Sequence, residues 1–176
     1  ICETNIFKAY RNKVKRLAKA YSLVNENQVV SVNSADDTGI KEDSIDYIFT
    51  DPPFGANIMY SELNFISETF LGVKTDFIRE AVENKSRNVS LFDYQKIMTS
   101  CIQHYFKLLK PGKWMTVEFS NTSASVWNGI QTAIQSAGFI VANVSALDKQ
   151  QGSFKAVNTV TAVKQDLIIS CYKPSS

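Results

Sequence analysis

The chain has 176 residues, of which 44% are hydrophobic, 11% aromatic and 20% charged, and its formal net charge is +2. This length predicts about one domain, with enough residues to bury a core without disulfides or a structural metal. The aromatic content and balanced charge exclude an intrinsically disordered chain, and no apolar run reaches the ~18 residues that a membrane-spanning helix needs.

The first predicted element is an amphipathic helix, for which Thr4 or Asn5 can serve as the N-cap. Its apolar stripe recurs at helical spacing and consists of Ile6, Phe7, Tyr10, Val14, Leu17, Tyr21 and Val24. Residues 1–25 contain six Lys and Arg against Glu3 alone, a local charge of +5, so the remaining residues sum to −3. A polyanionic partner fits this asymmetry, although a basic helix face is more often simply solvated.

Five short apolar segments predict strands, at 28–32, 46–50, 114–119, 139–147 and 166–172. Because most of them alternate with predicted helices, we expect a parallel α/β sheet with helices on both faces. No helix is expected between the last two strands, so the final strand should join the sheet antiparallel to its neighbours.

Shorter helices are predicted at about 60–71, 76–83 and 123–137. Gly72 and Gly138 end the first and the last of these. A longer helix is expected to have Asp93 as its cap and to end at Pro111–Gly112. Its apolar stripe consists of Tyr94, Ile97, Cys101, Ile102, Tyr105 and Leu109.

The cysteines and the single histidine argue against a metal site. Cys2, Cys101 and Cys171 are odd in number and lack CxxC spacing, which fits a reducing cytoplasm. Cys101 and His104 could share one helix face, but two ligands do not make a site, and both positions also fit an apolar core stripe. Nothing at the amino terminus resembles a signal peptide. We therefore expect a cytoplasmic protein with no metal and no membrane partner.

The most informative segment is Thr50–Gly55, with the sequence TDPPFG, directly after the second predicted strand. Ligands of open α/β sheets bind beyond the carboxyl ends of strands. Pro52 and Pro53 lack an N–H and hold the residue before each of them extended. The segment therefore presents the Asp51 carboxylate and backbone carbonyls as fixed acceptors, with the flat ring of Phe54 beside them.

Such a constellation suits a planar ring that carries an exocyclic amino group. The amino hydrogens would donate to Asp51 and to the Pro52 carbonyl while Phe54 stacks on the ring. Two fixed acceptors would free the nitrogen lone pair for in-line attack on a methyl sulfonium, mainly through positioning and electrostatics. The alternative interpretation is that Asp-Pro-Pro only terminates a strand.

The TDPPFG segment resembles the [DNS]-P-P-[YFW] hallmark of amino-methyltransferases that use S-adenosyl-L-methionine, above all the N6-adenine DNA methyltransferases. The stretches 57–63, 108–113 and 164–170 resemble further parts of these enzymes, so the resemblance extends from about residue 28 to residue 176. It implies a Rossmann-like class I methyltransferase sheet with an antiparallel last strand. It also implies S-adenosyl-L-methionine as the methyl donor and DNA as the partner.

The same resemblance assigns residues to the site. The target-base group would consist of Asp51, Pro52, Pro53 and Phe54, acting on a base flipped out of the duplex. Asp36 would lie near the adenine of the donor, and Gly55 is also assigned to the donor side. Asn57 and Tyr60 would line the base pocket, although both could equally cap or pack the following helix.

The 176 residues lack the family's D-x-F-x-G-x-G-like donor loop, and none of the seven glycines forms a G-x-G pair. We therefore expect residues 1–176 to be a single partial methyltransferase domain, with 1–27 leading in as a basic helix. Because the first residue is Ile1, we expect a fragment or a processed chain. The isolated chain should bind the donor weakly or not at all and be inactive, and an open sheet edge beside strand 46–50 offers a route to self-association.

Several other functions stay open at this point. N4-cytosine DNA methyltransferases and N2-guanine RNA methyltransferases also transfer a methyl group to an exocyclic amino group of a planar base. A nucleic-acid-binding module without catalysis, with the basic first helix as its contact, is an alternative from another class. A methyltransferase acting on a small molecule or a protein amide is a further one.

Overall fold

The computed structural model describes residues 5–22, 27, 29, 31, 33–56, 58–120, 124–148 and 165–175. The chain divides into two compact units, Ile1–Val32 and Asn33–Ser176. The first contains helix α1 (Ile6–Tyr21), and the Asn5 side chain accepts a hydrogen bond from the backbone N–H of Lys8 (3.1 Å). This confirms the predicted helix and its cap. Of the predicted strand 28–32, only Val29 and Ser31 are described, and neither is in a strand.

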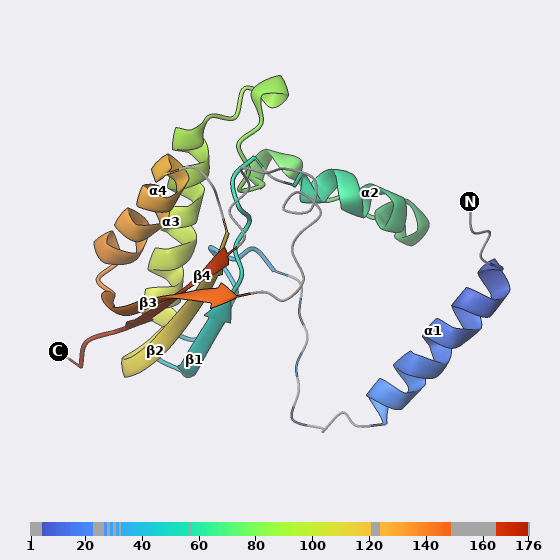
Figure 1. Ribbon diagram of the computed structural model, residues 1–176, viewed down its shortest axis with the longest axis horizontal. Helices are drawn as coiled ribbons and strands as arrows, with labels where there is room; N and C mark the ends of the chain where they lie inside the picture. The colour runs from blue at the N-terminus through green and yellow to red at the C-terminus, as the bar shows by residue number, and fades with distance from the viewer. Residues whose placement is uncertain are drawn as a thin grey trace. The chain divides into compact units, whose positions relative to one another are not determined.

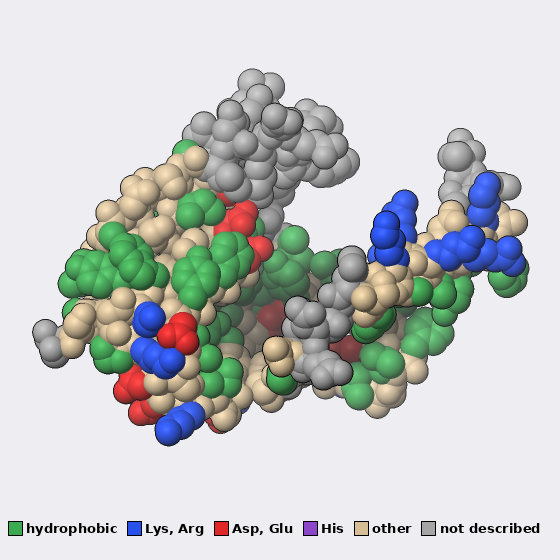
Figure 2. Space-filling view, turned by 90° about the horizontal axis from the view of Figure 1, so that it is seen from below, with side chains coloured by type: hydrophobic (Ala, Val, Ile, Leu, Met, Phe, Trp, Pro, Cys, Tyr) green, Lys and Arg blue, Asp and Glu red, His purple; other side chains and the backbone are tan. Residues whose placement is uncertain are grey.

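Helix α1 is amphipathic and wholly exposed, with no buried residue. Lys and Arg side chains occupy one side of it and hydrophobic side chains the other (Figure 2). No helix in the described parts of the chain is long and apolar enough to cross a membrane.

The second unit is built on a four-stranded sheet with the order β1-β2-β4-β3. The strands are β1 (Ile45–Thr50), β2 (Leu109–Phe119), β3 (Ile140–Asp148) and β4 (Gln165–Tyr172). β1 and β2 are parallel, whereas β4 is antiparallel to both β2 and β3. The predicted α/β class and antiparallel last strand are therefore confirmed, and this strand lies between β2 and β3.

The helices of this unit are α2 (Tyr60–Leu71), α3 (Leu91–Leu108) and α4 (Ala124–Ser136), with 3₁₀ turns η1 (Phe77–Arg79) and η2 (Lys85–Arg87). α3 and α4 lie side by side against one face of the sheet (Figure 1). The strand residues on this face are buried, among them Met115, Val117 and Ile169. On the opposite face Tyr47 and Trp114 are paired neighbours and both are about half exposed (53% and 45%).

The prediction of helices on both faces is therefore not met by the described residues of this unit. α3 and α4 cover one face, and α2 has no buried residue at all.

Three predicted boundaries are wrong for local reasons. The segment 76–83 contains only the single turn η1, where the Ile78 backbone N–H donates to the Asp76 side chain. α3 has Ser90 as its N-cap, and Asp93 lies at the third helical position, where the two side chains form a reciprocal capping box. α3 ends at Leu108 and β2 begins at the next residue. Pro111–Gly112 therefore lies inside β2 and does not end the helix.

The glycine stops, in contrast, are as predicted. Gly72 follows α2 in the left-handed conformation, at φ +67°. Gly138 has φ +102°, and its N–H donates to the Gln135 carbonyl (3.0 Å) while the Phe139 N–H donates to the Ile134 carbonyl (3.2 Å). These two bonds are those of a Schellman motif, which closes α4.

Candidate functional site

The Asp51–Gly55 turn follows β1 directly and packs against the hydrophobic core through Phe54. Pro52 and Gly55 are buried, Pro53 and Phe54 are half-buried, and Asp51 is exposed. The Tyr94 hydroxyl on α3 donates a hydrogen bond to the Pro53 carbonyl (2.7 Å). Burial raises the pKa of Tyr94, against a smaller lowering by a backbone hydrogen bond at Gly55. The phenol therefore stays protonated and keeps the turn in place.

Phe54 is held by aromatic packing. Its ring meets Phe119 edge-to-face at a centroid distance of 5.3 Å, and Phe119 in turn stacks on Trp127 at 6.2 Å. An edge-to-face pair of this kind stabilises one ring orientation beyond the burial of apolar area. The direction of the turn is thus set by the sheet core and not by the loop alone.

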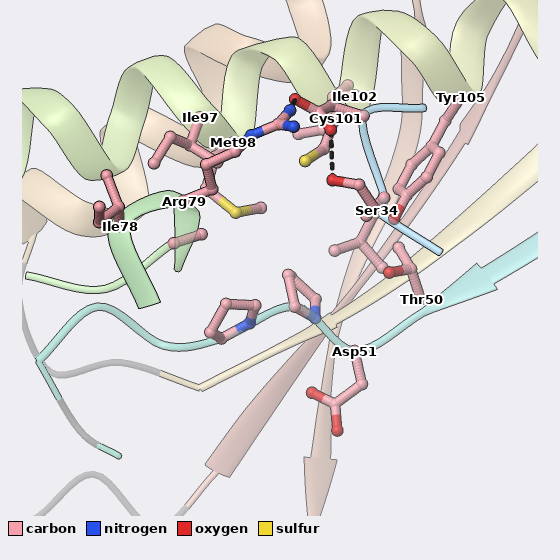
Figure 3. A pocket seen from close by; sticks show the side chains of 16 residues that line it. Ser34, Thr50, Asp51, Ile78, Arg79, Ile97, Met98, Cys101, Ile102 and Tyr105 are labelled. Carbon is pink, nitrogen blue, oxygen red and sulfur yellow. Dashed lines mark hydrogen bonds and ion pairs between the residues drawn. The ribbon is translucent and has the colours of Figure 1, made fainter. Parts of the chain in front are cut away.

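A cavity of about 410 Å³ lies between this turn and α3. One wall is formed by Thr50–Pro53 and the other by the α3 side chains Ile97, Met98, Cys101, Ile102 and Tyr105 (Figure 3). The lining is completed by Ser34–Asp36, Ile78, Arg79, Ala81 and Val117. The α3 stripe predicted from the sequence as core is therefore also a cavity wall over much of its length.

The polar groups of the cavity are concentrated where Asp36 meets Arg79. Their ion pair measures 2.7 Å, and the Ser34 hydroxyl also donates to the Asp36 carboxylate. The Ser34 hydrogen bond and, next, the Arg79 guanidinium lower the pKa of Asp36, against a partial opposing effect of burial. Asp36 is therefore ionised at neutral pH and acts only as an acceptor. The cavity thus combines mostly apolar walls with one adjacent acceptor and donor.

Asp51 and Asp36 point in different directions. Although Asp51 contributes to the cavity lining, its carboxylate points away from Ser34 and Arg79 (Figure 3). Asp36 is bonded to both of those residues. Both residues therefore line the same cavity while their carboxylates point in different directions.

The structure brings some of the predicted site residues together and leaves others apart. Asp36, Asp51, Pro52 and Pro53 all line the cavity, whereas Phe54, Gly55 and Tyr60 do not. Tyr60 is the first residue of α2 and is 42% exposed, and Asn57 lies outside the described residues.

The start of α2 is fixed by residues that sequence reasoning missed. Met59 offers no side-chain cap, and the Glu80 carboxylate instead accepts from the Ser61 N–H (3.0 Å) and hydroxyl (2.6 Å). Arg87 pairs with the same carboxylate at 3.2 Å. Arg79 and Tyr94 were missed as site residues too. Tyr94 was interpreted as core, and nothing in the local pattern around Arg79 or Glu80 marks a partner so far away in sequence.

Cys101 and His104 lie in different surroundings. Burial, and next the Asp36 carboxylate, raises the pKa of the Cys101 thiol from 9.0 to about 11. His104 instead contacts Thr38, with its Nε2 atom 3.2 Å from the Thr38 backbone nitrogen. No group of three or more His, Cys, Asp or Glu side chains suited to a metal occurs within the described ranges.

Comparison with known proteins gives structural but not sequence relatives. No protein-family model and no curated protein matches the sequence. A protein from Thermus thermophilus named as a DNA modification methylase, in complex with S-adenosyl-L-methionine, is 15% identical at a TM-score of 0.50, covering 82% of this chain and 55% of that one. The PvuII DNA methyltransferase (cytosine-N4-specific) is 17% identical at 0.52, covering 77% and 45%.

The [4+2]-cyclase SpnF is also similar, at 12% identity and a TM-score of 0.52, covering 92% of this chain and 62% of that one. The chain spans about half the length of the two methyltransferase-type structures. A cyclase among the neighbours shows that this fold hosts more than one chemistry, so function has to be argued from the site. What these likenesses establish is the fold: the chain has the Rossmann-like α/β fold found in S-adenosyl-L-methionine-dependent methyltransferases.

Proposed function

We propose that the Asp51–Phe54 turn is the target-base site of an enzyme that transfers a methyl group from S-adenosyl-L-methionine to an amino group of a nucleic-acid base. The N6 amino group of adenine in DNA is our first choice of acceptor. The observation that carries the proposal is the rigid Asp-Pro-Pro-Phe turn at the end of a parallel strand, where Asp51 lines the cavity and its carboxylate points away from Ser34 and Arg79. The DNA-methylase names of two structural neighbours support it.

The residues of the turn fit the acceptor side of this reaction. Asp51 would accept one amino hydrogen and the Pro52 carbonyl the other, which leaves the nitrogen lone pair free for attack. Positioning and preorganised acceptors are sufficient for such a step, so a strong general base is not required. Phe54 would provide the aromatic face beside the base, in an orientation stabilised by Phe119.

The cavity residues fit the donor side. A volume of about 410 Å³ lies within the ~300–1,000 Å³ range of small-molecule sites, and the walls are predominantly apolar. The ionised Asp36 would accept from the exocyclic amino group of an adenine ring held between Pro53 and Met98. When bound, S-adenosyl-L-methionine supplies the electrophilic methyl group. Gly55, which lies outside the cavity lining, would act here only through the turn it closes.

A second acceptor has to be tested in the same way. The likeness to the PvuII enzyme favours keeping the N4 amino group of cytosine beside adenine N6. N2 of guanine in RNA presents comparable chemistry and stays the third choice.

The deciding experiment uses the protein expressed from its complete gene. It is incubated with methyl-labelled donor and with DNA or RNA, and the nucleic acid is then digested to nucleosides. We expect label in N6-methyldeoxyadenosine, lost in Asp51→Ala. Label in N4-methyldeoxycytidine or N2-methylguanosine would replace the acceptor, and equal labelling by wild type and Asp51→Ala would overturn the proposed site.

A nucleic-acid-binding module without catalysis would give different results with the same protein. It would methylate nothing, and its nucleic-acid affinity would fall steeply with salt. That salt dependence would be reduced by neutralising the exposed cations of α1, namely Lys8, Arg11, Lys15 and Lys19. This alternative is excluded if the wild-type protein methylates nucleic acid and its Asp51→Ala variant still binds DNA without methylating it.

A further inference from the structure

We propose that His104 is a positioning residue that holds the turn 34–38, and with it Asp36, at the edge of the cavity. It does so by accepting a hydrogen bond from the Thr38 backbone. The proposal rests on the proposed function only for the role of Asp36 toward a bound adenine ring. The contact itself, and the state of the imidazole that it requires, are independent of any ligand.

The geometry places a single imidazole nitrogen at the turn. His104 Nε2 lies 3.2 Å from the Thr38 backbone nitrogen and 3.0 Å from the Thr38 hydroxyl oxygen. The backbone N–H can only donate, so Nε2 carries the lone pair and the proton of the neutral ring lies on Nδ1. The hydroxyl then shares the same acceptor as a second donor.

The turn has little regular structure of its own. Within 33–42 the described backbone pairing is the isolated bridge between Ser34 and Asp37, and the Asn33 side chain donates to the Thr38 carbonyl (3.3 Å). Further along, the Asp43 and Ser44 N–H groups donate to the carbonyls of Lys107 and Leu108 at 2.9 and 3.0 Å. The carboxyl-terminal part of α3 thus supports both ends of this segment, and His104 is the support next to Asp36.

The other contacts of Asp36 are less firmly anchored. Ser34 belongs to the same turn and moves with it. The Arg79 side chain is 63% exposed, and exposed ion pairs contribute little to stability. His104, in contrast, is half-buried on the longest helix of the unit. Thr38 is only two residues from Asp36, so its backbone bond sets where that carboxylate can lie.

His104 does not line the cavity, which makes the idea testable without altering the walls. Three substitutions separate hydrogen bonding from packing. In His104→Gln the amide oxygen reaches the ε position and can accept from Thr38. In His104→Asn the amide ends at the δ position, too short for this bond, and His104→Ala removes the group.

The first readout is made on the unliganded chain by NMR. Because the sequence has one histidine, long-range proton–nitrogen correlation gives its tautomer without ambiguity. We expect the proton on Nδ1, and slow hydrogen exchange of the Thr38 amide in wild type and His104→Gln but fast exchange in His104→Asn and His104→Ala. An Nε2–H tautomer, or a Thr38 amide equally protected in His104→Ala, would overturn the proposal.

The second readout is titration with S-adenosyl-L-homocysteine of the same variants in the protein expressed from its complete gene, because the isolated chain is expected to bind the donor weakly or not at all. We expect wild type and His104→Gln to agree, and His104→Asn and His104→Ala to bind about tenfold more weakly, the equivalent of ~1.4 kcal/mol. Equal binding by His104→Ala and wild type would contradict the positioning role. If wild type binds neither this ligand nor adenosine, the donor site of the proposed function fails, while tautomer and exchange still decide the role of His104.

Discussion

Residues of the turns 34–38 and 51–55 line the same cavity, but different kinds of interaction hold the two turns in place. Each carries one proposed functional carboxylate, and each is followed or closed by a glycine with positive φ, Gly39 at +69° and Gly55 at +74°. The turn at Asp51 is stiffened by its own prolines and by direct attachment to β1. The turn at Asp36 depends on side chains from distant parts of the chain.

This difference has a chemical reason. In the proposed reaction Asp51 has to meet a developing charge without moving, and a preorganised acceptor costs no rearrangement at that moment. Asp36 would only hold the ring of a ligand that enters and leaves, so a turn held by replaceable hydrogen bonds is sufficient. We therefore expect greater rigidity where the proposed chemistry occurs than where the proposed ligand binds.

The largest expected effects come from exchanging the two carboxylates for alanine in the complete protein. We expect Asp51→Ala to lower kcat by about 100-fold or more while the KM for the donor stays nearly unchanged. Asp36→Ala should raise the donor KM by about tenfold, the loss of one hydrogen bond to a charged group. Steady-state kinetics with varied donor separates the two. Asp51→Asn, which keeps an acceptor oxygen, is the matched control and should retain part of kcat. Equal effects of both alanine variants on the donor KM would contradict the proposal that Asp51 acts in the chemical step and Asp36 in donor binding.

The stiffness of the Asp51 turn can be tested at its hydrogen bond from α3. Tyr94→Phe leaves the Pro53 carbonyl without this partner, and we expect a loss of about 1–3 kcal/mol in the free energy of unfolding. Tyr47→Phe removes a bond of equal length, 2.7 Å, from the Tyr47 hydroxyl to Thr116, but at an exposed position, so its cost should be ~0.5 kcal/mol or less. Chemical denaturation measures both. Equal costs would show that the Tyr94 bond does not hold the turn.

The two glycines provide a smaller comparison. Alanine in the left-handed region costs about 1–2 kcal/mol at either position. An added Cβ at Gly39 would meet no atom within 4 Å, so Gly39→Ala should show only this backbone cost. Gly55 is buried, and Gly55→Ala should therefore cost more. A larger loss in unfolding free energy for Gly39→Ala would contradict the contrast between the two turns.

The smallest effect concerns the thiol in the cavity wall. With its pKa raised to about 11, Cys101 is almost entirely protonated near pH 8 and should react slowly with iodoacetamide. Because the unfolded chain ionises this thiol at lower pH than the folded chain, the free energy of unfolding should fall as the pH rises from 9 toward 11. Alkylation rates followed by mass spectrometry in a Cys2→Ser background test the first point. Rapid modification of Cys101 at pH 8 would show that the cavity wall is open.

The same contrast explains what the sequence could predict. The Asp51 turn, β1, α2 and the Gly72 and Gly138 stops depend on neighbouring residues, and each was predicted from its local pattern. The contacts of the Asp36 turn were not, because Thr38 and His104 are 66 residues apart and Asp36 and Arg79 are 43 apart. Local patterns do not encode such pairs.

Some errors were local as well. Ser90 and Asp93 both belong to one capping box, and composition alone does not decide which of them is the N-cap. The apolar stripe of α3 has the same spacing whether it faces a core or a cavity, so Met98 and Cys101 could not be recognised as cavity residues.

In the proposed reaction the Pro52–Pro53 segment lies between the adenine of the donor at Asp36 and the amino-group acceptor at Asp51. The most direct test is NMR of the protein expressed from its complete gene with S-adenosyl-L-homocysteine, recording intermolecular nuclear Overhauser effects from the two adenine ring protons. We expect contacts to side chains of the cavity wall on α3, chiefly Ile97 and the Met98 methyl group. Contacts to Phe54 or Tyr60 without any to Ile97 or Met98 would contradict this arrangement.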